Sequence, residues 1–71
     1  MDGQQRALFE LQRDWAITQR EEAKKALAFY DRVGARFIAN NVDITEEQKA
    51  STRGIIENMT TLIDGIEVYL A

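Results

Sequence analysis

The 71-residue chain contains no cysteine, no histidine and no proline. Without cysteine it can form neither a disulfide nor a thiolate nucleophile, and without histidine it lacks imidazole catalysis and the usual zinc ligands. Disulfides and metals are the common supports of a small hydrophobic core. The chain is therefore expected to form a single domain that is stabilised by helix packing and by association.

Long apolar runs are also absent. The longest wholly apolar stretch is 26–30, far short of the ~20 residues that a membrane-spanning helix needs. The first six residues carry no apolar segment typical of a secretory signal, and Asp2 occupies the position where myristoylation needs glycine. These features predict a cytoplasmic protein without membrane contact.

The charge is weakly acidic and unevenly distributed. The net charge is −3. Residues 1–39 hold seven basic and six acidic side chains, for +1, whereas residues 40–71 hold two basic and six acidic ones, for −4. Such a chain has no long-range attraction for polyphosphates or anionic lipids, so a nucleic-acid partner is disfavoured.

The first half of the chain is rich in good helix formers. At 100° per residue, one face collects the apolar residues Leu8, Leu11, Trp15, Ala23, Ala26, Tyr30, Val33 and Phe37. Asp2 is placed to cap the start of this helix, with Gln5 three residues later. The pattern predicts one helix over about 3–39, and a break near Gln19 stays open.

A turn and a second helix follow. Asn40 and Asn41 suit a left-handed helix C-terminus, because asparagine tolerates positive φ. Thr45 and Gln48 form a possible capping box, and Asp43 with Glu46 is an alternative cap. A second helix over about 45–70 is indicated by a 4-3-4-3 apolar spacing in Ile55, Met59, Leu62, Ile66 and Tyr69.

The sequence therefore predicts an all-α fold, a single antiparallel helical hairpin over 1–71. In size and layout this hairpin is similar to Rop-type hairpins, which dimerise into four-helix bundles. It also resembles the small helical-hairpin chaperones that escort needle subunits of bacterial secretion machines. The likeness is one of architecture and carries no functional residue across.

A turn centred near 42–43 pairs residues whose numbers sum to about 85, so the second helix ends opposite about residue 14. Leu8, Phe9 and Leu11 then project beyond it without cover. Exposed apolar side chains predict a homodimer, forming a four-helix bundle, or a different protein partner. The parallel or antiparallel arrangement of the two hairpins stays open. The expected interface comprises Leu8, Phe9, Leu11, Trp15, Phe29, Val33 and Tyr69.

Three further features have competing interpretations. Arg6, Arg13 and Arg20 recur every seven residues. They form either a strip that binds RNA or an acidic partner, or a solvated flank that reaches acidic side chains on the neighbouring helix. Small residues on the second helix mark either a close-packing surface or a tolerant exposed side; they are Gly54, Thr61, Gly65 and Val68. The acidic side of that helix is a possible site for a protein partner.

Catalysis is not expected. Neighbouring carboxylates such as Glu21 and Glu22 point about 100° apart on a helix, and the chain has no glycine-rich phosphate loop and no serine with an adjacent base. The sequence therefore predicts no catalytic residue, metal site, cofactor or small-molecule substrate, and indicates a small regulatory or adaptor protein.

Overall fold

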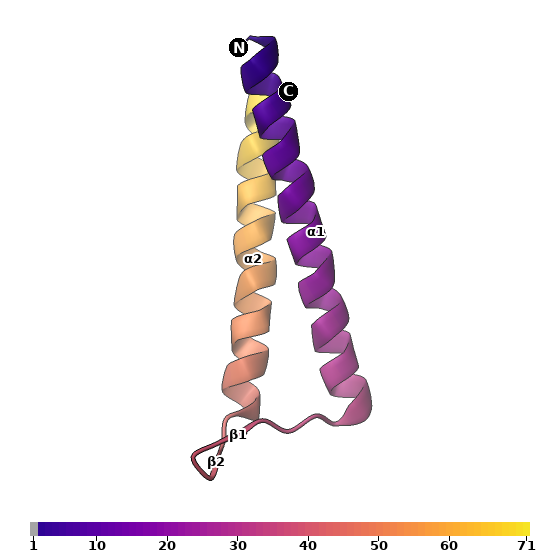
Figure 1. Cartoon of the computed structure of the whole chain (residues 1–71), viewed down its shortest axis with the longest axis vertical. Coiled ribbons are helices and arrows are strands. Elements are labelled where there is room, and N and C mark those ends of the chain that lie inside the picture. Colours follow the sequence, from indigo (N-terminus) through magenta and orange to yellow (C-terminus); the bar gives the residue numbers. More distant parts are fainter. Residues whose placement is uncertain (1) are drawn as a thin grey trace.

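The computed structural model, which describes residues 2–71, is an antiparallel α-helical hairpin (Figure 1). The elements in order are α1 (Gly3–Val33), β1 (Ile38–Ala39), β2 (Val42–Asp43) and α2 (Thr45–Leu70). The two termini lie at one end of a molecule that measures 53 × 21 × 15 Å, and the connection lies at the other end. The predicted all-α hairpin is confirmed.

Helix α1 is continuous through Gln19 but ends at Val33, six residues earlier than predicted. The Asp2 side chain accepts a hydrogen bond from the Gln5 N–H at 2.8 Å, as expected for the cap. Gly34 ends the helix because it adopts a left-handed conformation, with φ of 62°, and donates its N–H to the Tyr30 carbonyl. This conformation carries little steric cost for glycine, so Gly34 is the termination signal that the sequence prediction overlooked.

The connection contains a two-stranded antiparallel ribbon, which the sequence analysis did not predict. Ile38 pairs with Asp43, and Ala39 pairs with Val42. Asn40 and Asn41 do adopt positive φ, 51° and 66°, but they link β1 to β2 and do not end α1. Two consecutive left-handed residues match the twist of a tight β-hairpin, and asparagine tolerates both positions.

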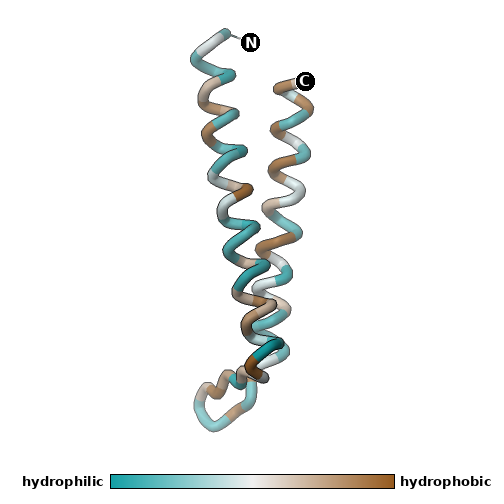
Figure 2. The backbone as a smooth tube through the Cα atoms, turned by 90° about the vertical axis from the view of Figure 1, so that its right-hand side faces the viewer, coloured by the Kyte–Doolittle hydropathy of each residue, from teal (hydrophilic) through white to brown (hydrophobic). Residues whose placement is uncertain are grey.

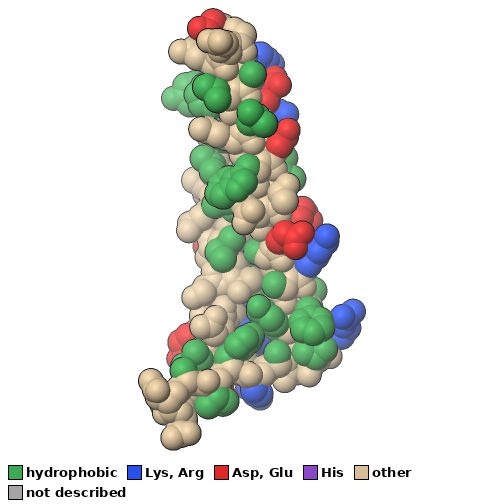
Figure 3. Space-filling view, viewed as in Figure 1, with side chains coloured by type: hydrophobic (Ala, Val, Ile, Leu, Met, Phe, Trp, Pro, Cys, Tyr) green, Lys and Arg blue, Asp and Glu red, His purple; other side chains and the backbone are tan. Residues whose placement is uncertain are grey.

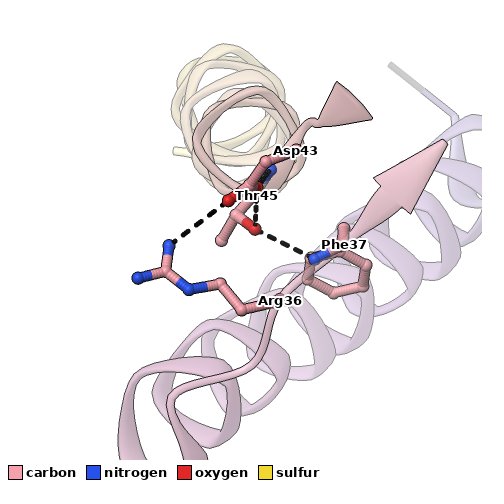
Figure 4. A network of polar contacts seen from close by, with 4 residues as sticks. All are labelled: Arg36, Phe37, Asp43 and Thr45. Carbon is pink, nitrogen blue, oxygen red and sulfur yellow. Dashed lines mark hydrogen bonds and ion pairs between the residues drawn. The ribbon is translucent and has the colours of Figure 1, made fainter. Parts of the chain in front are cut away.

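A polar network joins the connection to α2 (Figure 4). The predicted capping box of Thr45 with Gln48 is wrong, because Gln48 donates its N–H to the Ile44 carbonyl. Instead, the Asp43 carboxylate accepts hydrogen bonds from the Thr45 hydroxyl and N–H, and the Thr45 hydroxyl accepts the Phe37 N–H at 2.9 Å. These bonds from Thr45, with the Arg36 guanidinium 3.7 Å away, hold the pKa of Asp43 below its ordinary 3.8.

We expect Thr45→Val to lower the free energy of unfolding by about 1–3 kcal/mol, since it leaves the Phe37 N–H without its acceptor at a fully buried site. Urea unfolding followed by circular dichroism measures the change. Thr45→Ser keeps the hydroxyl and is expected to lower the free energy of unfolding much less. The control is Thr18→Val, which removes a hydroxyl that donates to the Asp14 carbonyl on the exposed side of α1. An equal decrease in the free energy of unfolding for Thr18→Val would contradict the role given to Thr45.

The contact between α1 and α2 follows one heptad pattern in each helix, which we call the seam. Its positions recur at alternating steps of three and four, and every side chain in it is buried or half-buried. In α1 the seam consists of Phe9, Arg13, Ala16, Arg20, Ala23, Leu27 and Tyr30. In α2 it consists of Thr52, Ile56, Met59, Ile63, Ile66 and Leu70.

The register differs from the predicted one. Arg6 Nη2 donates to the Leu70 carbonyl, Arg20 Nη1 to the Thr60 hydroxyl, and Lys49 Nζ lies 2.9 Å from Asp31. The residue numbers in these pairs sum to 76 or 80, not 85, because the connection adds more residues than the predicted turn. As a result, α2 reaches the level of Arg6, and the predicted overhang of Leu8, Phe9 and Leu11 is wrong.

Candidate functional site

Adjacent pairs of apolar residues that begin with a large side chain recur along both helices. Helix α2 has Ile55–Ile56, Leu62–Ile63 and Tyr69–Leu70 at seven-residue intervals. Helix α1 has Leu8–Phe9 and Trp15–Ala16 seven residues apart, and Phe29–Tyr30 fourteen residues further on, because Glu22–Ala23 occupies the position between. The second member of each pair lies in the seam. The first member is rotated by 100° out of the seam and is exposed. Each helix therefore has an apolar stripe that extends beyond its contact with the other helix.

The exposed members of both helices lie on the same side of the hairpin. The two helices are right-handed and antiparallel. The residue that precedes a seam residue therefore faces the same side of the hairpin in α1 and in α2. The structure agrees, because Leu8 and Gln12 of α1 line one groove together with Tyr69 of α2. We call this side the apolar face. It comprises Leu8, Trp15, Phe29 and Val33 of α1 with Ile55, Leu62 and Tyr69 of α2.

The exposure on the apolar face is substantial. Leu8 is 59% exposed, Trp15 55% and Tyr69 63%, whereas Ile63 in the seam is 3% exposed. Figure 2 shows hydrophobic segments recurring along both helices, and Figure 3 shows hydrophobic side chains spread down the visible face while charged ones gather along one edge. The apolar face is therefore the main apolar surface that the chain leaves uncovered.

The predicted interface residues are only partly brought together. Phe9 lies in the seam and stacks on Tyr69, with ring centroids 5.2 Å apart. Leu11 is 66% exposed but lies on the outer side of α1, where it lines a second shallow groove with Leu8. The apolar surface thus extends around α1 at this end.

At the other end of the apolar face, Phe29 and Val33 lie beside the connection. Phe29 packs edge-on against Tyr30 and carries the Arg32 guanidinium 5.5 Å above its ring. Tyr30 in turn packs edge-on against Phe37, with centroids 5.0 Å apart. Seam, connection and apolar face therefore share one aromatic cluster, which holds Phe29 in place.

The opposite side of the hairpin is charged, and we call it the acidic face. Its acidic residues are Glu10, Asp14, Glu21 and Asp31 of α1 and Glu46, Glu57, Asp64 and Glu67 of α2. The four acidic residues of α1 on this face are each paired with a basic side chain: Glu10 with Arg6 at 3.3 Å, Asp14 with Arg13 at 3.6 Å, Glu21 with Lys24 at 3.6 Å and Asp31 with Lys49 at 2.9 Å. Few charged groups lie on the apolar face: the carboxylate of Glu22, which Lys25 contacts at 3.9 Å, and the Arg32 guanidinium over the Phe29 ring.

The arginine ladder lies against α2. Arg6 and Arg20 donate to α2 at 3.1 and 3.3 Å, and Arg13 occupies a seam position, where it contacts Asp14 at 3.6 Å. The interpretation as a flank contacting the neighbouring helix fits this placement, although the partners on α2 are a carbonyl and a hydroxyl, not acids. The ladder is therefore occupied by contacts within the chain.

The small residues of α2 lie mostly away from α1. Gly54, Thr61 and Val68 are on the outer side of α2, and Gly65 borders the apolar face between Leu62 and Tyr69. A Cβ atom added at Gly54 or Gly65 would meet nothing within 4 Å. Packing within the chain therefore does not require either glycine.

Within residues 2–71, no group of three or more acidic side chains is arranged to hold a metal ion. Over the same residues, neither helix contains an apolar segment long enough to cross a membrane. No protein-family model, curated protein or solved structure matches the chain. A functional assignment therefore depends on the two contrasting faces of the hairpin.

Proposed function

We propose that the chain is a non-catalytic interaction module that self-associates through its apolar face into a four-helix bundle and presents its acidic face to a protein partner. The observation that carries the proposal is the segregation of side chains. One side of the hairpin is apolar with a single carboxylate, and the other side holds most of the acidic residues. Amphipathic hairpins bury such a face by association.

The size of the apolar face supports an interface. Its seven large side chains are between 38% and 63% exposed, which amounts to on the order of 600 Å² of apolar surface per chain. Monomeric proteins rarely leave a larger patch open, and two such faces together exceed the ~1,000 Å² of a specific interface. Association through this face is therefore favoured over a free monomer.

A second copy fits the face better than a charged partner does. A two-fold dimer brings identical surfaces together, so a face with many like charges would repel itself, whereas an almost uncharged face does not. The acidic faces then lie on the outside of the bundle. A protein partner with a basic surface is the complementary ligand for them.

RNA binding through the arginine ladder is the weaker candidate. Arg6 and Arg20 already donate hydrogen bonds to α2, and the acidic face lies beside them. Proteins that bind nucleic acids usually present a strongly basic surface with aromatic platforms. No observation on this hairpin favours that function over protein binding.

Sedimentation equilibrium tests the proposal. We expect a species of twice the 8.1 kDa chain mass at micromolar concentration. Because burial of the apolar face is hydrophobic, the dimer is expected to persist at high salt. A monomer at all concentrations would overturn self-association, and dissociation by salt would contradict assembly through the apolar face.

A further inference from the structure

We infer that a polar zone in the middle of the apolar face makes this face selective for a second copy of the chain, against helices whose apolar stripe is uninterrupted. The polar zone consists of Gln19 and Glu22 of α1 and Asn58 of α2, and it borders Ile55. This inference rests on the proposed function and adds the residues that choose the partner. Specificity is a difference between two affinities, and polar groups that the wrong partner leaves without hydrogen bonds provide it.

The polar zone lies on the same side of the hairpin as the large apolar side chains. Gln19 and Glu22 follow Trp15 by four and seven residues, which places the three on one side of α1. Asn58 precedes Leu62 by four residues on α2. Glu22 therefore occupies the position at which the heptad pattern of α1 calls for another large apolar side chain. Glu22 and Asn58 are exposed, and Gln19 is half-buried.

Apolar cover over the polar zone is unfavourable. The Glu22 carboxylate lies 3.9 Å from Lys25 Nζ, and the two side chains are 67% and 75% exposed, so water solvates most of this ion pair. A partner that covers the pair with apolar side chains removes that water, and the attraction between the two charges does not make up the loss. The amides of Gln19 and Asn58 lose hydrogen bonds to water in the same way. A helix with an uninterrupted apolar stripe is therefore penalised at the middle of the face.

A second copy places its own polar zone over this one. The midpoint of α1 is residue 18, and that of α2 falls between residues 57 and 58, so the polar zone lies at mid-length of the hairpin. When two copies overlap over their full length about a two-fold axis, middle meets middle, whether the two connections lie at the same end or at opposite ends. The amides of Gln19 and Asn58 both donate and accept hydrogen bonds, so they find polar partners in either case. A second copy therefore avoids the penalty.

Competition with a synthetic helix tests the selectivity. The probe is a peptide with leucine at both apolar positions of every heptad, and it is mixed in equal amount with the chain. The test variant is Glu22→Leu with Asn58→Leu, which completes the apolar stripe of the face. The matched control is Thr18→Leu with Thr61→Leu, which adds the same two side chains at exposed positions on the outer sides of both helices. Native mass spectrometry counts homodimers and complexes of chain with probe.

We expect the natural chain to form homodimers in preference to complexes with the probe. For the test variant, the ratio of probe complex to homodimer is expected to rise at least about tenfold, because the buried polar groups no longer penalise the probe. The control is expected to keep the ratio of the natural chain. Leucine is a good helix former, and circular dichroism checks that each variant remains helical. Glu22→Ala with Asn58→Ala, which adds no bulk, is expected to change the ratio in the same direction.

The outcomes separate this inference from the proposed function. If the natural chain is a dimer on its own but both variants of the polar zone leave the ratio unchanged, the inferred selectivity is overturned and self-association stands. An equal rise for Thr18→Leu with Thr61→Leu also overturns it, because added apolar surface anywhere on the hairpin would then suffice. A natural chain that is monomeric without the probe overturns the proposed function, and the selectivity with it.

Discussion

Replacing Leu8 and Trp15 together with glutamine is expected to weaken self-association by between about 10² and 10⁴-fold. Both side chains are more than half exposed in the hairpin, so the substitutions leave the seam intact. Burial of the exposed half of each side chain contributes on the order of 1 kcal/mol, and a two-fold dimer contains each residue twice. The resulting loss of ~3–6 kcal/mol in the free energy of dimerisation corresponds to this weakening of about 10² to 10⁴-fold, since about 1.4 kcal/mol changes the affinity tenfold.

Sedimentation velocity over a dilution series measures this loss, and circular dichroism checks that the variant remains helical. The matched control is Leu11→Gln, which removes an equally exposed leucine from the outer side of α1. It is expected to leave the dimer unchanged. If Leu11→Gln dissociates the dimer as strongly as the double variant does, the interface lies around α1 and not on the apolar face.

Ile63→Ala is expected to be the most destabilising single change, lowering the free energy of unfolding by about 2–5 kcal/mol. Ile63 is 3% exposed and is one of the few large side chains buried among residues 2–71. A small domain has a total stability of only ~5–15 kcal/mol. The melting temperature is therefore expected to fall by at least about 10 °C.

Thermal unfolding followed by circular dichroism measures the shift, at one fixed protein concentration because dimerisation also stabilises the fold. Val68→Ala is the control: it truncates a more exposed side chain on the outer side of α2 and is expected to change the free energy of unfolding by less than ~0.5 kcal/mol. Equal destabilisation by Val68→Ala would contradict the assignment of the seam.

The two candidate seams of α2 show why the site was only partly predictable. Met59 and Ile66 complete a heptad spacing with either of two sets of residues. One set is Ile55, Leu62 and Tyr69, and the other is Ile56, Ile63 and Leu70. The first set gives the apolar spacing by which the second helix is recognised in the sequence, whereas in the structure the second set is the more buried and lies in the seam. A shift of one residue rotates a helix surface by 100°, and hydrophobic periodicity alone does not say which half of a wide stripe faces its own chain.

The end of α1 was missed for a local reason. The apolar pattern continues from Val33 to Phe37 and Ile38, so periodicity favoured a longer helix. Gly34 outweighs that pattern because its left-handed conformation satisfies the Tyr30 carbonyl and turns the chain away. The shorter α1 shifts the register, and α2 then reaches far enough to cover Phe9.

By itself the sequence determined the two long helices, the cap at Asp2 and the apolar stripes on both helices, because helix propensity and 3.6-residue periodicity are local properties. Only the tertiary structure decided the register, the placement of Arg6 and Arg20 against α2, and the separation of an apolar face from an acidic one. These features depend on how the connection orients one helix about the other, and that orientation involves contacts between residues that are distant in the chain.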